Sequence, residues 1–466
     1  MKKFFYRFCP LLFISSVSLS GFGQSKNMTG SISDNLLERF RTENARLDAS
    51  SKALKNAMNS TDINTLAAST SGLATDDDFT YRVKSKDITD QKRSGRCWLF
   101  TGLNMLRGQA INQHNLGELK LSQVYNFFYD QLEKSNLFLQ EVIDSRETPF
   151  DDRRVEWLFN HPLSDGGTFM GVSDLVTKYG VVPDGVMKET FTANNTSQFS
   201  KLLGWKLREM GLELRQMAQD GASLDQIAGR KENMLSEVYK MLVRAYGEPP
   251  TEFEWSLRDS SGRPLEKKKY TPTEFYQAVF GNDLVNGYVM LMNDPTRPYF
   301  KMYEIDLDRH SYDGQNWKYL NLPMDDIKKI AIESLKDSTM MYFSCDVSKY
   351  LNSKDGTLDE GNFDYESLLG TTFNMDKRQR IMTGASASAH AMTLVGVDVN
   401  KKGDPTRWLI ENSWGNTGHN GFLIASDKWM DEYLFRLVVE KKFLPKKYTK
   451  ILSEKATLLP AWDYMF

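Results

Sequence analysis

The chain has 466 residues, of which 40% are hydrophobic and 12% aromatic, a composition typical of a globular protein with a large core. Its 59 Lys and Arg residues nearly balance 61 Asp and Glu residues, so the charge favours neither nucleic acid nor an anionic membrane as a partner. No stretch has the ~18 to 20 apolar residues that a membrane span needs. The sequence shows no spacing typical of metal ligands, and neither a metal nor another cofactor is predicted.

The first 23 residues carry the pattern of an export signal. Met1-Lys2-Lys3 is basic, residues 11–22 form a short apolar run, and Gly21-Phe22-Gly23 places small residues at the positions that matter for cleavage. The sequence therefore predicts a signal peptide over residues 1–23 and an exported protein, either periplasmic or secreted. A cytoplasmic protein with an apolar N-terminus is the alternative.

A cysteine stands at the start of a helical pattern. Apolar residues, Leu103 and Leu106 among them, follow Cys97 at helical spacing, so an amphipathic helix is expected to begin there. The N–H groups at a helix N-terminus favour a thiolate, and Arg93 and Arg96 add positive charge nearby. The pattern predicts an activated thiol, and a buried structural cysteine is the alternative.

Further elements are expected along the chain. Helices are predicted over residues 32–55, 121–139 and 324–335, and a helical pair over 197–246. Hairpin strands are predicted over 255–270 and 285–306, and a polar loop over 61–78. Asp165-Gly166-Gly167 lies between the cysteine and the histidine considered next. Paired glycines let a peptide backbone approach closely and pair in extended form, although a simple turn is the alternative.

One of the five histidines differs from the others in its surroundings. His390 precedes an apolar strand, and a turn over residues 400–405 leads into a second strand over 407–411, which predicts a hairpin. That hairpin brings Asn412 beside His390, where the amide oxygen orients the imidazole and Trp414 shields the bond from water. A satisfied core histidine is the alternative. The other four, which have polar contexts and are expected at the surface, are His114, His161, His310 and His419.

Four separated motifs together resemble the papain-like cysteine peptidases. They are Gln91, Gly95-Arg96-Cys97-Trp98, His390 with its small neighbours, and Asn412-Ser413-Trp414-Gly415. The papain signature has Ser or Ala where Arg96 stands, and it places His and Asn ~130 to 150 residues after the cysteine. Here the interval from the cysteine to the histidine is 390 − 97 = 293 residues, which indicates large insertions.

Those insertions point to one branch, the bleomycin hydrolase and aminopeptidase C family. Other stretches that resemble this branch are residues 178–183, 285–298, 345–347 and 459–463. The resemblance implies an α+β papain-like fold with a helical half and an antiparallel β half. It implies an N-terminal helical and loop extension over 24–78, a catalytic domain over 79–466, a helical insertion at about 197–247 and a C-terminal arm at about 456–466. It also implies a homohexamer.

The resemblance further implies the roles of individual residues. Cys97 attacks the substrate carbonyl and forms a thioester, His390 transfers the proton, and Asn412 keeps the imidazole oriented. The Cys97 backbone N–H and the Gln91 side chain hold the oxyanion. Trp98 and Trp414 are expected to pack around these catalytic groups without acting on the substrate themselves.

The remaining implied residues bind the peptide. Asp165, Gly166 and Gly167 are expected along the substrate, and the carboxylate of Phe466 is expected to pair with the substrate's free amino group, which makes the enzyme an aminopeptidase. The arm ends a few residues earlier than is usual in this family. Release of dipeptides or longer pieces, and endopeptidase cleavage, therefore remain open. Two further alternatives are a cysteine acyltransferase and a peptide-binding protein without turnover.

Overall fold

The computed structural model describes residues 30–43, 48–69, 72–85, 87–281 and 283–466. The chain divides into two compact units, Met1–Leu66 and Ala67–Phe466. The predicted signal peptide lies outside the described residues. The second unit begins before the predicted catalytic domain over 79–466, and within this unit the Asp76 carboxylate binds the Arg407 guanidinium, with Oδ2 3.0 Å from Nη1.

Three short helices begin the described chain: α1 (Asp34–Glu43), α2 (Ala49–Met58) and α3 (Ile63–Ala67). The first two lie in the segment expected to be helical. The third occupies part of the segment that was expected to be a loop. Asp48 caps α2 by accepting a hydrogen bond from the Ser51 N–H, which is the usual role of an aspartate before a helix.

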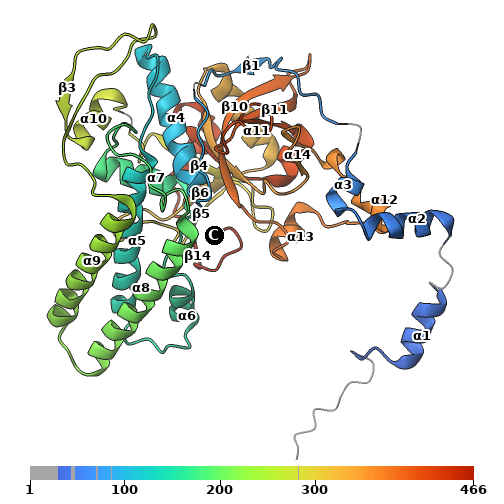
Figure 1. Ribbon diagram of the computed structural model, residues 1–466, viewed down its shortest axis with the longest axis horizontal. Coiled ribbons are helices and arrows are strands. Elements are labelled where there is room, and N and C mark those ends of the chain that lie inside the picture. Colours follow the sequence, from blue (N-terminus) through green and yellow to red (C-terminus); the bar gives the residue numbers. More distant parts are fainter. Residues whose placement is uncertain (1–29, 44–47, 70–71, 86, 282) are drawn as a thin grey trace, which may run out of the picture. The chain divides into compact units, whose positions relative to one another are not determined.

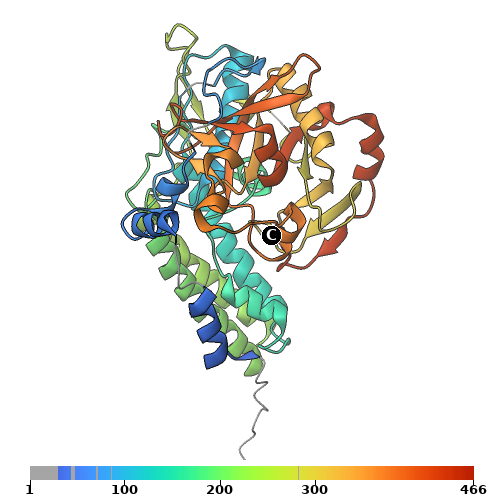
Figure 2. The same cartoon turned by 90° about the vertical axis from the view of Figure 1, so that its right-hand side faces the viewer.

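The helical half of the second unit follows. Its helices are α4 (Cys97–His114), α5 (Gln123–Asp144), α6 (Arg153–Asn160), α7 (Phe169–Tyr179), α8 (Thr196–Gln219), α9 (Leu224–Tyr246) and α10 (Pro272–Val279). The predicted helical pair is α8 and α9, which pack against α5 and extend away from the sheet (Figures 1 and 2). Helix α4 was expected to be amphipathic, but it is buried on nearly all sides because α7 and β10 both pack on it.

The rest of the second unit is mainly sheet. Its strands are β1 (Tyr81–Arg82), β2 (Phe253–Trp255), β3 (Lys268–Tyr270), β4 (Tyr288–Met292), β5 (Lys301–Ile305), β6 (Lys318–Asn321), β7 (Met341–Cys345), β8 (Leu351–Asn352), β9 (Thr357–Leu358), β10 (His390–Val399), β11 (Pro405–Glu411), β12 (Phe422–Ser426), β13 (Leu434–Glu440) and β14 (Thr457–Leu459). The helices among them are α11 (Met324–Lys336), α12 (Tyr365–Leu369), α13 (Lys377–Met382), α14 (Asp427–Tyr433), α15 (Lys446–Leu452) and the 3₁₀ turns η2 (Glu360–Asn362) and η3 (Lys441–Phe443).

Within the described residues, one 12-stranded, mostly antiparallel sheet runs in the order β14-β5-β6-β4-β13-β7-β10-β11-β12-β9-β8, with β1 on β10. The predicted hairpins are present as β2–β3 and β10–β11. Strands β4 and β5 do not form the hairpin expected over 285–306, because β6 lies between them.

The topology places the start of α4 against the start of β10. Helix α4 contacts β10, and it packs so closely on α7 that Gly102 leaves no room for a side chain, since an added Cβ would lie 2.6 Å from Val172 on α7. On the sheet, His390 is paired with Cys345 of β7, which is buried. No helix among the described residues is long and apolar enough to cross a membrane.

Candidate active site

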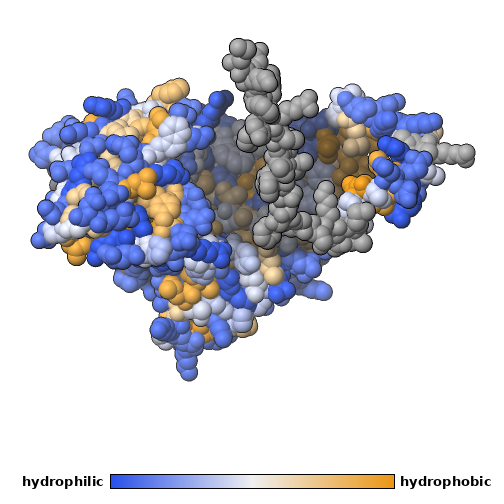
Figure 3. Space-filling model, turned by 90° about the horizontal axis from the view of Figure 1, so that it is seen from below, coloured by the Kyte–Doolittle hydropathy of each residue, from blue (hydrophilic) through white to orange (hydrophobic). Residues whose placement is uncertain are grey.

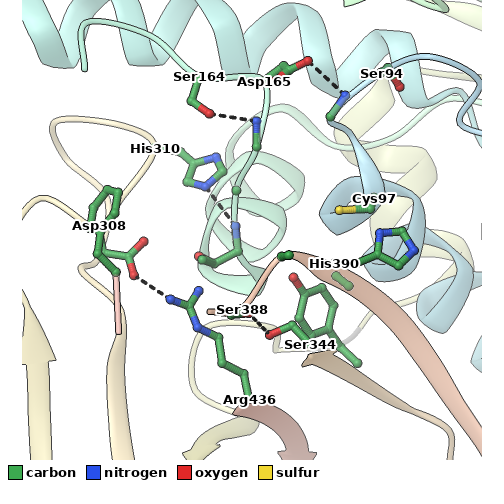
Figure 4. A pocket seen from close by; sticks show the side chains of 18 of the residues that line it. Ser94, Cys97, Ser164, Asp165, Asp308, His310, Ser344, Ser388, His390 and Arg436 are labelled. Atoms are coloured by element: carbon green, nitrogen blue, oxygen red, sulfur yellow. Dashed lines mark hydrogen bonds and ion pairs between the residues drawn. The ribbon is translucent and has the colours of Figure 1, made fainter. Parts of the chain in front are cut away.

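A cleft of about 570 Å³ lies where the helical half meets the sheet. Gln91, Cys97 and His390 line it, as do Gly167 and Phe466, so the cleft brings together residues from the two ends of the second unit. Figure 4 shows Cys97 and His390 on one side of the cleft and Asp308 and Arg436 on the other. The cleft therefore joins most of the residues that the sequence motifs singled out.

Cys97 is the first residue of α4, as predicted. Cys97 and His390 lie on the same side of the cleft (Figure 4), and the backbone N–H of Ala391, the residue directly after His390, lies close enough to the sulfur to lower the pKa of the thiol. The N–H groups of Leu99 and Phe100 both donate to the Arg96 carbonyl just before the helix, at 2.9 and 3.0 Å, whereas the Cys97 N–H has no carbonyl partner among the described residues.

The positive charge expected from the two arginines is not available to the sulfur. The Arg96 side chain is fully buried and pairs with Glu189, with Nη2 2.9 Å from Oε2, while Arg93 is exposed. Burial raises the pKa of the Cys97 thiol, and the hydrogen bonds from the N–H groups of Ala391 and Trp98 offset only part of this increase. The prediction of a thiolate stabilised by neighbouring arginines was therefore wrong.

The hairpin of β10 and β11 places Asn412 beside His390, as predicted. The Asn412 Oδ1 atom lies 2.9 Å from His390 Nε2 and also accepts a hydrogen bond from the Ser413 N–H at 2.8 Å. Because Oδ1 is an acceptor, Nε2 carries the proton and Nδ1 remains the basic nitrogen. The Trp414 ring stacks on the imidazole at a centroid distance of 4.7 Å. Burial lowers the pKa of His390 to about 4, although the bond to Asn412 opposes this shift.

Gln91 is held at the edge of the cleft by the loop that follows Asn412. Its backbone N–H donates to the Ser413 carbonyl at 2.8 Å, and its Oε1 accepts from the Ser413 hydroxyl at 2.7 Å. One hydrogen of its Nε2 group donates to the Ser94 carbonyl at 2.7 Å. The second Nε2 hydrogen is left to serve a ligand in the cleft.

Residues 164–168, which include the paired glycines, form a wall of the cleft that we call the glycine wall. Asp165 Oδ2 accepts from the Gly95 N–H at 2.9 Å, so the side chain of Asp165 ties this wall to the loop before the cysteine. The indole N–H of Trp98 donates to the Asp165 carbonyl at 3.0 Å. Gly166 and Gly167 line the cleft with their backbone exposed to it. The Trp98 side chain therefore binds the glycine wall and not the sulfur.

His310 was expected at the surface, and this prediction was wrong. It is 3% exposed and lines the cleft, where Nδ1 lies 2.5 Å from Asp130 Oδ1. The Lys134 ammonium contacts the same carboxylate through Oδ2 at 2.9 Å. The sequence holds only a weak signal for this group, since Asp130 and Lys134 share one face of a helix but His310 lies in a polar loop.

The C-terminal arm reaches the cleft, as the resemblance implied. Strand β14 pairs with β5, after which Asp463 binds Arg297 through two hydrogen bonds of 2.8 and 3.2 Å. The Met465 carbonyl accepts a 2.6 Å hydrogen bond from Arg436, a buried residue that the motifs did not identify. The Phe466 ring packs on Trp157 at 5.1 Å. These contacts anchor the arm along its length.

Comparisons with known proteins agree with this geometry. The model of the Peptidase C1-like family matches residues 31–466. Aminopeptidase E of Lactobacillus helveticus is 38% identical over 386 residues, which covers 83% of this chain and 88% of that protein. Aminopeptidase C of Lactococcus lactis is 35% identical over 444 residues, 94% of this chain and 99% of that protein. Human bleomycin hydrolase is 36% identical over 393 residues, 82% and 86% of the two chains.

A solved structure extends the match to three dimensions. The crystal structure of PepW from Lactobacillus rhamnosis superposes with a TM-score of 0.90 at 34% identity and covers 94% of this chain and 99% of that chain. The predicted α+β papain-like fold is thereby confirmed. The chain belongs to the Peptidase C1-like family, and it is a papain-like cysteine aminopeptidase of the aminopeptidase C and bleomycin hydrolase type.

Proposed function

We propose that this enzyme releases single residues from the free N-termini of peptides through a thioester on Cys97. The observation that carries the proposal is the cleft itself, which Cys97, His390 and the C-terminal Phe466 line together. A nucleophile beside a base, with the base oriented by a third group, is the arrangement that acyl transfer requires. The chain's own terminus in the same cleft supports an exopeptidase.

The chemical steps follow from the protonation of the two neighbours. Burial favours the neutral forms of Cys97 and His390, so the thiol transfers its proton to Nδ1 of His390 as the sulfur attacks the scissile carbonyl. The negative oxygen that results accepts hydrogen bonds from the Cys97 N–H and the Gln91 amide. His390 returns the proton to the leaving amine, and the thioester forms.

Hydrolysis reverses these steps with water as the nucleophile. His390 removes a proton from water, which attacks the thioester carbonyl, and the sulfur leaves as the thiol after it regains that proton. Asn412 Oδ1 accepts the Nε2 hydrogen throughout, so the imidazole ring does not rotate away from the sulfur.

The free amino group of the substrate is recognised by the carboxylate of Phe466. An ammonium and a carboxylate form a charge-assisted hydrogen bond, which is stronger than a neutral one. The anchoring of Asp463 by Arg297 and of Met465 by Arg436 limits how far the terminus can move. Peptides that extend beyond the first residue on this side would meet the arm.

One comparison of substrates tests this proposal. An unblocked peptide and its N-acetylated form are incubated with the enzyme and with Cys97→Ser as the inactive control, and products are followed by mass spectrometry. We expect single residues from the unblocked peptide and little turnover of the acetylated one. Equal rates on both would contradict an exopeptidase, and dipeptides as first products would assign a dipeptidyl peptidase. Transfer to an added amine in preference to water would assign an acyltransferase.

We also propose that the enzyme is exported and forms a homohexamer. The basic and apolar pattern of residues 1–23 supports export, and intact-mass analysis of the protein from the cell envelope and medium would detect its removal. Large apolar side chains exposed on the helical pair support an oligomer; they are Leu202, Trp205, Leu212 and Leu224. Figure 3, which shows the chain from below, has hydrophobic residues interspersed among hydrophilic ones. Light scattering after size-exclusion chromatography decides between a monomer and a hexamer.

A further inference from the structure

A buried charged cluster lies behind the glycine wall and takes no part in the chemistry described above. It consists of Asp130 and Lys134 on α5 and His310 in the loop after β5, and we refer to it as the wall cluster. Asp130 is fully buried, and His310 is 3% exposed. Buried charges are costly unless they are paired, so a cluster of this kind beside a substrate cleft calls for a physical reason.

Lys134 connects the cluster to the wall. Its ammonium donates to the Ser164 carbonyl at 3.0 Å, to the Gly166 carbonyl at 2.6 Å and to Asp130 Oδ2 at 2.9 Å. All three hydrogens of the ammonium are therefore used. Two of them hold main-chain oxygens of the wall, which fixes the direction of the 164–165 and 166–167 peptide planes.

His310 holds the other end of the wall. The Thr168 N–H donates to His310 Nε2 at 3.2 Å, and Nδ1 lies 2.5 Å from Asp130 Oδ1 (Figure 4). An Nε2 atom that accepts a hydrogen bond carries no proton, so Nδ1 carries the proton and donates it to Asp130. The cluster therefore requires the neutral imidazole with this one tautomer.

Two glycines make room for the imidazole. A Cβ atom added to Gly167 would lie 2.1 Å from His310 Cε1, and one added to Gly171 would lie 2.2 Å from the same atom. The Trp98 ring covers the imidazole edge at a centroid distance of 4.6 Å. His310 is thus enclosed by the wall on one side and by the indole that follows the nucleophile on the other.

The main-chain groups of one residue in the wall take no part in these hydrogen bonds. The Gly166 carbonyl is bound by Lys134, the Gly166 N–H by the Ser164 hydroxyl at 3.0 Å, and the Thr168 N–H by His310. In the described chain, neither the N–H nor the carbonyl of Gly167 has a hydrogen-bond partner. Both belong to a residue that lines the cleft.

The family resemblance already places Gly167 along the substrate; we propose that the wall cluster is the positioning device that holds residues 164–168 with the Gly167 N–H and carbonyl directed at the substrate main chain. The carbonyl accepts an N–H or the α-ammonium of the peptide, and the N–H donates to a peptide carbonyl. His310 and Lys134 are positioning residues, since they act through the wall and not on the reacting atoms. The proposal rests on the proposed function, because it assigns a role in peptide binding.

The charges around His310 agree with a neutral ring. Burial lowers the pKa of His310, as does the nearby Lys134 ammonium, while the carboxylates of Asp130 and Asp308 act in the opposite direction. Burial raises the pKa of Asp130, but Lys134 and His310 outweigh this and the net shift is downward. The carboxylate therefore stays charged and keeps its two partners.

Three variants test the proposal. Lys134→Met keeps the length of the side chain but removes the bonds to the two carbonyls, and His310→Phe keeps the ring but removes its acceptor. His310→Gln restores an acceptor near the Nε2 position. Lys178→Met is the matched control, since Lys178 lies on α7, pairs with Glu133 and Asp313, and does not line the cleft.

The measurements are kcat and KM for an unblocked peptide, the rate at which iodoacetamide alkylates Cys97, and thermal unfolding. Loss of main-chain bonds that form equally in the ground and transition states raises KM and leaves kcat unchanged. We expect KM to rise about 10-fold or more in Lys134→Met and His310→Phe, with kcat and alkylation within about 3-fold of wild type. We expect His310→Gln to recover part of the loss and Lys178→Met to match wild type.

Several results would overturn the proposal. They are an unchanged KM in folded Lys134→Met, alkylation that falls in parallel with kcat/KM, and failure of all three cluster variants to fold, which would make the cluster a requirement of the fold alone. Failure of the proposed function is seen separately in the wild-type enzyme, as equal cleavage of acetylated and unblocked peptides. In that case the KM of the acetylated peptide tests the cluster in the same way.

Discussion

Removal of Phe466 tests whether the chain terminus is the receptor for the substrate's amino group. Without this residue the chain ends at Met465, whose carbonyl oxygen already accepts a 2.6 Å hydrogen bond from Arg436. The new carboxylate would therefore be paired with a buried guanidinium and set back by one residue from its present position in the cleft. A substrate ammonium would lose its partner although the arm remains anchored through Asp463 and Arg297.

The size of the effect follows from the strength of one charged hydrogen bond. A hydrogen bond to a charged group contributes about 1.5 to 3 kcal/mol. Since about 1.4 kcal/mol corresponds to a factor of ten, kcat/KM for unblocked peptides should fall about 10- to 150-fold. The acetylated peptide has no ammonium to lose, so its turnover should stay the same or rise as the cleft opens. Both values come from initial rates at substrate concentrations well below KM.

Phe466→Ala is the matched control. It keeps the terminal carboxylate in place and removes only the ring that packs on Trp157 at 5.1 Å. We expect its kcat/KM to remain within about 3-fold of wild type, because surface ring contacts contribute little. The reasoning would be refuted if the shortened enzyme kept full activity on unblocked peptides. It would also fail if the alanine variant lost as much activity as the deletion.

Three further predictions concern chemistry, pH and packing. Gln91→Ala should lower kcat about 100- to 1,000-fold by removing one oxyanion donor, and circular dichroism should show an intact fold. Burial lowers the pKa of His390 to about 4, from ~6.5 in the unfolded chain. As the pH falls, the unfolded chain therefore binds a proton at this imidazole before the folded protein does. The free energy of unfolding should consequently fall by up to about 3 kcal/mol between pH 6.5 and 4. Urea unfolding of His390→Gln should show a smaller loss over that range; an identical loss would contradict the assignment. Gly102→Ala should destabilise the fold by about 1 to 3 kcal/mol, because the added methyl group would overpack on Val172. In thermal unfolding, the double variant Gly102→Ala with Val172→Ala should recover part of this lost stability. Losses that simply add would contradict the contact.

Short-range features of this chain were predictable. Helices α4, α8 and α9 follow from apolar spacing, and the β10–β11 hairpin follows from two apolar runs joined by a turn. Because such a hairpin has a definite register, it was enough to place Asn412 next to His390. In each case the signal lies within a few residues of the feature that it predicts.

Features that depend on distant partners were not predictable. His310 lies in a polar stretch, and its burial depends on Asp130, which is 180 residues away in the chain. The uniform burial of α4 depends on α7 and β10, which both pack on it. The buried Arg96 guanidinium forms an ion pair with Glu189, which lies far from it in the sequence. None of these partners leaves a local pattern around the residue that it affects.

The amino-acid sequence by itself singled out Cys97, His390 and Asn412 as the proposed nucleophile, base and orienting amide, because each sits in a motif whose spacing specifies the local backbone. Only the tertiary structure decided the direction in which the pKa values of Cys97 and His390 shift, since burial is a property of everything packed around them. It also decided which main-chain groups of the cleft already have hydrogen-bond partners, because that depends on contacts made by Lys134 and His310 from separate parts of the chain.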